Sequence, residues 1–126
     1  RAGARLARVV VSVGDIFRAA QFYSLVLGQE GRRVSPGRYF FDLGNAVLAL
    51  YDPLAEGEAG PFQPYTEHIY LSVPDLDRTF RKAQKAGAAY LDEWIETMPW
   101  GERCFYAADP FGNRLCFVDE RTVFRG

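Results

Sequence analysis

The stretch VGDIFRAAQFYSLVLG, residues 13–28, carries the clearest pattern in the chain. Its apolar side chains recur at helical spacing, and Asp15 precedes them where its carboxylate can accept the unpaired N–H groups of a first helical turn. Gly28 follows the last apolar position and can adopt the left-handed conformation that commonly ends a helix. The pattern predicts a helix bounded by these two residues. The β-branched run LARVVVSV, residues 6–13, predicts a strand before it.

The same order of signals returns about sixty residues later. EHIYLSV, residues 67–73, alternates like a strand, Asp75 is placed to cap a helix, and Gly87 is placed to end it. The offset is 60 from Asp15 to Asp75 and 59 from Gly28 to Gly87. A repeat at one constant period indicates that a single supersecondary unit is duplicated.

Each predicted helix is followed by three short strand candidates separated by turn residues. These are residues 30–34, 38–43 and 46–51 in the first half, and 89–96, 102–108 and 114–119 in the second. The sequence therefore predicts an α+β fold in which two tandem β-α-β-β-β repeats form a curved mixed sheet around a cleft. We expect a single domain over residues 1–126, with repeat one at about 5–52, a connection rich in Pro and Gly at about 53–65, and repeat two at about 66–120.

Composition limits the classes of partner. The chain has 126 residues and a formal net charge of −1, with Lys and Arg scattered, so neither nucleic acid nor an anionic membrane surface is expected to bind it. No window is apolar enough to span a membrane and no export signal is evident, so a cytoplasmic protein with Cys104 and Cys116 reduced is expected. Aromatic residues make up 15%; we expect most of them in the core and the rest to line a ligand cavity.

Three segments together resemble one family: residues 13–28; HIYLSVPDLDRTFRKAQKAGA, residues 68–88; and PWGERCFYAADPFGNRLCFVDE, residues 99–120. The chain resembles the vicinal oxygen chelate superfamily, which groups glyoxalase I, bleomycin-resistance proteins and extradiol dioxygenases. The resemblance implies paired β-α-β-β-β units and favours a homodimer that shares its cleft; the sequence leaves open whether the two repeats pair within one chain or swap between two. In metal-dependent members, the resemblance also implies four side chains from four strands that hold a divalent ion able to chelate the substrate.

Counting from the helix caps, the four metal-ligand positions that the resemblance implies are Arg8, Ala49, His68 and Cys116, with Leu48 replacing Ala49 if the register is shifted by one. Arginine stays protonated and alanine has no donor atom. Only His68 and Cys116 remain, whereas catalytic zinc sites have three protein ligands. We therefore expect no metal and no other cofactor, with a divalent metal as the less favoured alternative.

The second half is closest in style to the metal-free bleomycin-resistance-type members, which sequester a ligand. The sequence thus predicts a metal-free small-molecule-binding protein, of a sequestering or resistance-like kind, with an aromatic-lined cleft. The expected ligand is small, apolar or aromatic, and neutral or anionic, because Arg8 and His68 would make one end of the cleft cationic. The candidate ligand-binding residues are Arg8, Ala49, Tyr51, His68, Tyr70, Trp94, Trp100, Tyr106 and Cys116, with Phe117 as a further stacking candidate, although core packing explains each aromatic residue equally well.

The alternative is a divergent metal-dependent lyase, isomerase or dioxygenase that acts on a vicinal-oxygen substrate. His68 would then be a metal ligand or the catalytic base, Arg8 would stabilise negative charge, and Cys116 beside His68 could supply a thiolate nucleophile. Asp52 and Glu102, at strand ends, could turn inward and complete a site. The sequence leaves open whether the protein is an enzyme.

Overall fold

The computed structural model describes residues 2–126, which contain two α-helices, nine strands and one short 3-10 helix. The first half runs β1 (Arg8–Ser12), α1 (Ile16–Leu27), β2 (Arg32–Ser35), β3 (Arg38–Asp42) and β4 (Val47–Tyr51). The second half runs β5 (Ile69–Val73), α2 (Leu76–Ala83), β6 (Tyr90–Leu91), β7 (Glu96–Thr97), β8 (Arg103–Ala108), β9 (Arg114–Asp119) and η1 (Glu120–Thr122). Neither helix in this described part is long and apolar enough to cross a membrane.

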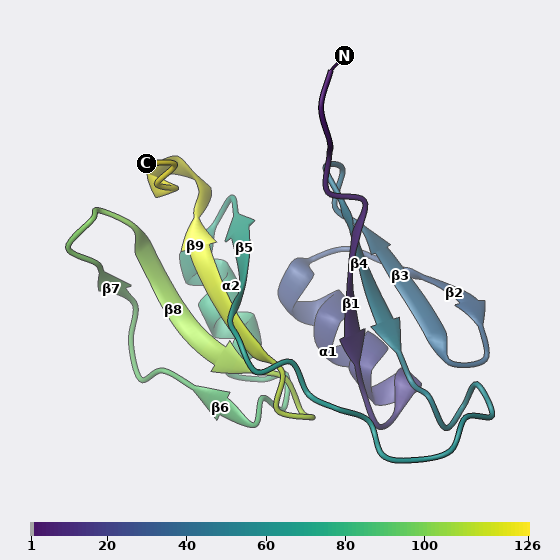
Figure 1. The fold of residues 1–126 in the computed structure, drawn as a ribbon. Coiled ribbons are helices and arrows are strands. Elements are labelled where there is room, and N and C mark those ends of the chain that lie inside the picture. The colour runs from purple at the N-terminus through teal and green to yellow at the C-terminus, as the bar shows by residue number, and fades with distance from the viewer. Residues whose placement is uncertain (1) are drawn as a thin grey trace.

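The strands confirm the predicted α+β class and the duplicated unit (Figure 1). In the first sheet the order is β1-β4-β3-β2, with β1 parallel to β4; in the second it is β5-β9-β8-β6, with β5 parallel to β9 and β7 paired to β8. The curved surface is divided into these two sheets, because no strand pairing joins edge strands β1 and β5 in residues 2–126. A hollow of about 290 Å³, lined in part by Val9, Ile69 and Tyr70, separates them.

The helix caps confirm the sequence pattern, with one correction. Asp15 accepts hydrogen bonds from the backbone N–H groups of the first turn of α1 at 3.1 Å, and Gly28 ends this helix with φ 68°. Asp75 caps α2 in the same way. The prediction that α2 extends to Gly87 was wrong, since it ends at Ala83. Beyond it the Lys85 and Ala86 N–H groups bond three residues back, in tight turns that replace the last helical turn.

The predicted strand over residues 89–96 is two short strands, β6 and β7, with a break between them. The reason lies at Asp92, whose carboxylate accepts the Tyr106 N–H at 2.8 Å. A side chain thus takes the place of a backbone carbonyl in the ladder, and the regular pairing stops.

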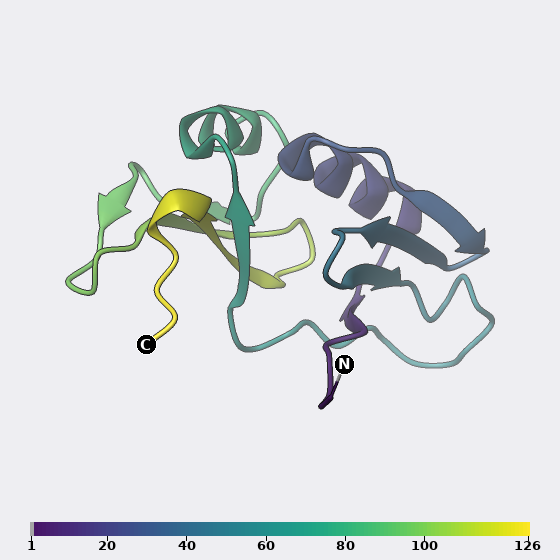
Figure 2. The same cartoon turned by 90° about the horizontal axis from the view of Figure 1, so that it is seen from above.

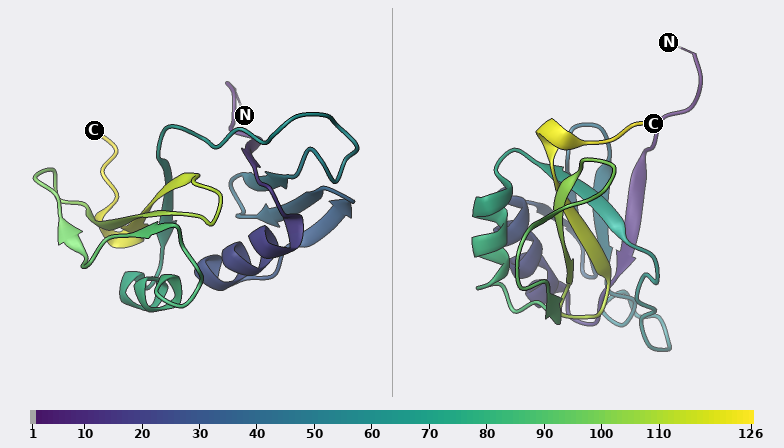
Figure 3. Two further views of the ribbon diagram at one scale, coloured as in Figure 1. Left: turned by 90° about the horizontal axis from the view of Figure 1, so that it is seen from below. Right: turned by 90° about the vertical axis from the view of Figure 1, so that its left-hand side faces the viewer.

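Both helices cover the same side of the two sheets (Figure 2; Figure 3). One hydrophobic cluster lies beneath them and draws on both halves, from Val11 and Tyr23 to Leu71 and Phe117. Phe117 is fully buried there and stacks on Phe105 at 5.1 Å between ring centroids, so its prediction as a cleft residue was wrong. Strand alternation explains this: residue 117 points to the helix side and residue 116 to the other.

A buried polar cluster joins the halves beside this core. Asp109, in the turn before β9, accepts hydrogen bonds from the Tyr23 hydroxyl on α1 at 2.7 Å and from the Asn113 side-chain amide at 2.8 Å. The same amide donates to the carbonyl of Ser12 at the end of β1. The DPFGN turn therefore ties the second half to the first, in addition to reversing the chain.

Candidate functional site

The sheet surface away from the helices, here called the open face, is the natural place for a ligand. Alternation along β1 sends Val9 and Val11 into the core and Arg8 and Val10 outward. Val10 is 51% exposed and Tyr70, on β5, is 57% exposed. Large apolar side chains on the edge strands of both sheets are thus left exposed on the open face.

The first hollow on the open face, the arginine hollow, lies in repeat one and has a volume of about 200 Å³. It is lined by Arg8, Val10, Arg38, Phe40, Ala49, Leu50 and Tyr51. The Arg8 guanidinium carbon lies 6.0 Å from the centroid of the Phe40 ring. Phe40 pairs with Ala49 across β3 and β4, so Ala49, and not Leu48, shares the open face with Arg8.

The two arginines of this hollow differ in their partners. Arg38 lies over the Tyr51 ring at 5.0 Å and is ion-paired with Glu56. Arg8 contacts Phe40 and, among the described residues, has no carboxylate within ion-pair distance. The arginine hollow therefore offers one uncompensated positive charge beside aromatic rings.

His68 lies in repeat two and lines a different part of the open face. Its ring packs edge-on against Tyr106 at 4.9 Å between centroids. Burial, and then the neighbouring Tyr70 hydroxyl, raise the pKa of Tyr106, so this phenol stays protonated. Arg8 lies in β1 and His68 immediately precedes β5 of the other sheet, and neither the arginine hollow nor either of the two hollows of repeat two described below is lined by both residues. Their meeting in one cleft stays a prediction.

Cys104 and Cys116 are free thiols in the described structure, and both are buried. Burial is the first cause that raises the pKa of each thiol, and the neighbouring cysteine raises that of Cys116 further. A fully buried, protonated thiol is a poor nucleophile and a poor metal ligand. The geometry thus does not favour the thiolate hypothesis, and Cys116 does not line a hollow with Arg8 or Ala49.

The four positions that the resemblance implies for a metal do not form a ligand set here. Arg8 is a cation, Ala49 has no donor, Cys116 is buried and protonated, and His68 packs against a tyrosine. Within residues 2–126, no three His, Cys, Asp or Glu side chains come together as a metal site would require. The residues present therefore do not fit a catalytic divalent ion, and the metal-dependent alternative is not favoured.

The remaining predicted residues line two further hollows of repeat two. The tail pocket, of about 480 Å³, is lined by Tyr70, Ser72, Trp100, Glu102, Val118, Val123 and Phe124. The acidic hollow, of about 350 Å³, is lined by Tyr90, Asp92, Glu93, Trp94, Glu96, Met98 and Tyr106. The predicted aromatic set is thus divided among three hollows.

Two carboxylates at strand ends behave differently. Asp52 is buried and accepts backbone N–H groups of Ile16 and Ala55, so it is structural. Glu102 turns toward the open face and lines the tail pocket. Sequence reasoning missed Phe40 and Phe124. Strand parity opposite Ala49 would have found Phe40, whereas nothing in the sequence signals Phe124.

Comparison with known proteins agrees with the fold. The sequence profile of the Glyoxalase/Bleomycin resistance protein/Dioxygenase superfamily matches residues 5–117, and the chain belongs to this family. YwbC of Bacillus subtilis is 30% identical over 122 residues, which cover 90% of this chain and 95% of that protein.

Solved structures with the same fold include a glyoxalase/bleomycin resistance protein from Albidiferax ferrireducens. It has a TM-score of 0.78 and 20% identity, over 91% of this chain and 98% of that one. A superfamily member from Sphaerobacter thermophilus has a TM-score of 0.69 and 27% identity, over 93% and 98% of the two chains. The first likeness shows the fold alone, and the two β-α-β-β-β units described above account for it.

Proposed function

We propose that the protein is a metal-free small-molecule-binding member of its family, and that it takes a flat, apolar or aromatic ligand bearing a negative charge. The observation that carries the proposal is Arg8, a guanidinium with no carboxylate partner among the described residues, set beside Phe40 in the arginine hollow. An arginine can pair with a carboxylate in two parallel hydrogen bonds while aromatic rings stack on the ligand body. Sequestration needs only this recognition and no reacting group.

We further propose that two copies pair and complete each other's cleft. In one chain the arginine hollow is open, and Arg8 and His68 lie on separate sheets. Residues 5–52 contain six Lys and Arg against four Asp and Glu, whereas residues 66–120 contain six against ten. Repeat one of one copy and repeat two of another therefore carry opposite net charge. Charge complementarity of this kind, with the exposed Val10 on edge strand β1, favours pairing of repeat one of one copy with repeat two of the other.

Titration calorimetry with naphthoate, a flat aromatic carboxylate, tests the ligand proposal. We expect saturable binding that Arg8→Ala weakens about tenfold or more, since a charge-assisted hydrogen bond is lost. Arg32→Ala is the matched control, because Arg32 is an exposed residue of the same sheet outside the hollow, and it should change the dissociation constant by no more than about twofold. Naphthalenemethanol, which has the same body without the charge, should bind more weakly than naphthoate.

If Arg8→Ala and Arg32→Ala lost the same affinity, the effect would come from the net charge of the protein and not from the arginine hollow, which would contradict the proposal. Light scattering tests the pairing separately. A molecular mass twice that of the chain is expected, and a Val10→Glu variant should shift it toward the monomer because a charge would be placed in the interface. A strictly monomeric protein at high concentration would contradict the shared cleft while leaving the arginine hollow testable.

A further inference from the structure

The tail pocket has a chemical character opposite to that of the arginine hollow. Three aromatic rings, Tyr70, Trp100 and Phe124, come to it from β5, from the turn before β8 and from the C-terminal tail. The rest of the lining is Ser72, Val118, Val123 and the single carboxylate of Glu102, with no Lys or Arg. The ring faces are accessible, because the three aromatic side chains are between 48% and 57% exposed.

Glu102 holds two of these aromatic residues in place. One carboxylate oxygen accepts the Trp100 indole N–H at 2.9 Å, and the other accepts the Phe124 backbone N–H at 3.0 Å. Each oxygen keeps a second lone pair for a ligand. The negative charge therefore lies between the rings and fixes their positions.

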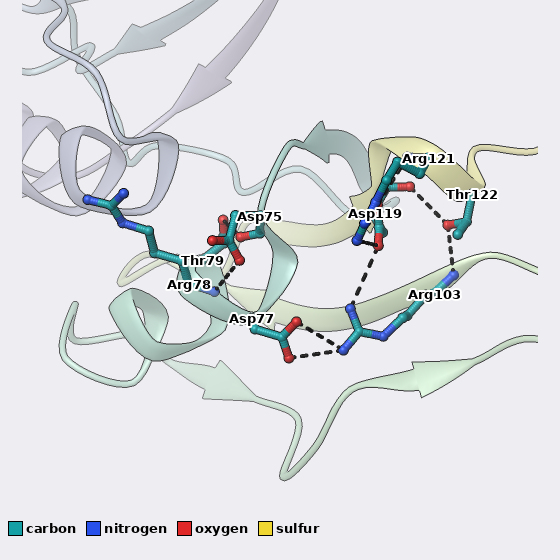
Figure 4. A network of polar contacts seen from close by, with 8 residues as sticks. All are labelled: Asp75, Asp77, Arg78, Thr79, Arg103, Asp119, Arg121 and Thr122. Atoms are coloured by element: carbon teal, nitrogen blue, oxygen red, sulfur yellow. Dashed lines mark hydrogen bonds and ion pairs between the residues drawn. The ribbon is translucent and has the colours of Figure 1, made fainter.

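The start of the tail is held independently by a charged network (Figure 4). Arg103 donates to Asp77 of α2 at 2.9 Å and lies 3.7 Å from Asp119, which Arg121 also contacts. The Thr122 hydroxyl accepts the Arg103 backbone N–H at 3.0 Å. Residues 119–122 are thus anchored near α2, and the chain beyond them turns to the side of the sheet away from the helices (Figure 2), where Val123 and Phe124 form a wall of the pocket.

The local charge of this region is negative. Residues 90–102 contain four acidic residues and no Lys or Arg. The nearest guanidinium groups along the chain belong to Arg103, which is bound to Asp77 and Asp119, and to Arg125, an exposed residue next to Phe124 that does not line the pocket. A ligand in the tail pocket therefore meets one carboxylate and three aromatic faces, and no Lys or Arg in the pocket lining.

We propose that the tail pocket binds an organic cation with a substituted ammonium group. Such a cation is attracted by the faces of aromatic rings and by the Glu102 charge, and its alkyl groups fill the space between Val118 and Val123. The proposal stands apart from the proposed anion binding, because Arg8 lines a different hollow. It also gives the C-terminal segment a role, since Phe124 supplies one wall.

Choline is the probe, and the two tryptophan indole N–H resonances are the reporters in a proton–nitrogen NMR titration of the full chain. The Trp100 indole resonance, assigned with Trp100→Phe, should move with saturable dependence on choline. Trp94 bonds to Glu96 outside the tail pocket and is the internal control, whose resonance should not move. Dimethylbutanol, the neutral isostere of choline, should bind at least about fivefold more weakly, since the cation–π and charge interactions are lost.

Variants distinguish binding in the tail pocket from attraction of choline by the acidic residues around it. Glu102→Gln should weaken choline binding at least about fivefold. Glu93→Gln removes a nearby charge outside the pocket and should change the dissociation constant for choline by no more than about twofold. Arg8→Ala should have no effect, so failure of this proposal and of anion binding are distinguishable. If Glu102→Gln fails to fold, Phe124→Leu keeps an apolar wall without the ring and should also weaken choline and spare dimethylbutanol.

Three results would overturn the proposal. The first is equal affinity for choline and dimethylbutanol, and the second is equal movement of the Trp94 and Trp100 resonances on addition of choline. The third is a Trp100 resonance that does not move with choline but moves when the protein is diluted. The last result would assign the pocket to a second copy of the chain.

Discussion

Tyr23→Phe removes a single hydroxyl from the polar cluster that joins the two repeats. In the native protein this hydroxyl donates to Asp109 at 2.7 Å, and both residues are fully buried. Burial, and then the Asp109 charge, raise the pKa of Tyr23 well above its ordinary value, so the hydroxyl stays a donor at neutral and mildly alkaline pH. The substitution leaves the ring and its packing in place.

The expected loss of stability depends on the hydrogen bonds that Asp109 keeps in the variant. Its other hydrogen bonds come from the Phe111 and Asn113 backbone N–H groups and from the Asn113 side chain, so neither oxygen is left without a donor. Hydrogen bonds to buried charged groups contribute about 1.5–3 kcal/mol, and we expect the free energy of unfolding to fall by about 2 kcal/mol. For a domain of this size the Tm should fall by roughly 8 °C.

Urea unfolding followed by far-ultraviolet circular dichroism measures this change. Tyr39→Phe is the matched control, because Tyr39 is a half-buried tyrosine that packs on Phe41 and has no hydrogen bond to its hydroxyl among the described contacts. The free energy of unfolding of Tyr39→Phe should fall by less than about 0.5 kcal/mol. Equal, small losses in both variants would refute the claim that the Asp109 cluster joins the repeats.

Three further outcomes are expected. Gly37→Ala should cost about 1–3 kcal/mol in urea unfolding, because the added Cβ would lie 2.3 Å from the Asp52 carbonyl oxygen; an unchanged midpoint would contradict this close approach. Cys104 and Cys116 should both be unreactive toward a thiol reagent at pH 8 in the native protein and both react in urea, since burial raises the pKa of each thiol; rapid native labelling would contradict their burial. The Arg121 hydrogen bonds lower the pKa of Asp119, so the ionised Asp119 carboxylate stabilises the fold above about pH 4, and this stabilisation is lost as the pH falls further. The free energy of unfolding should therefore fall less between pH 6 and pH 3 in Asp119→Asn than in the native protein.

The sequence predicted the parts of the fold that depend on local signals. The caps at Asp15 and Asp75 and the end at Gly28 follow from backbone groups that each helix leaves unpaired, and alternation placed Arg8 on the open face. The break at Asp92 could not be predicted, because it depends on a side chain that bonds a strand distant in sequence.

The candidate site was predicted only in part, for a similar reason. Alternation identifies a face but not a shared hollow, so Arg8 and His68 were expected together although they lie on separate sheets. Phe117 was assigned to the cleft by its aromatic character, against its strand parity. The position of Phe124 is fixed by Glu102 and by the charged network, and neither contact is encoded by local spacing.

Metal dependence of ligand binding is the measurement that tests the account most directly. Naphthoate binding is measured by calorimetry before and after exhaustive chelation, and again after addition of Mn²⁺, Ni²⁺, Zn²⁺ or Fe²⁺. Because Arg8, Ala49 and Cys116 do not fit a metal, we predict one unchanged dissociation constant in all these conditions and its loss in Arg8→Ala. Binding that disappears on chelation, returns with one of the ions and survives in Arg8→Ala would contradict the account.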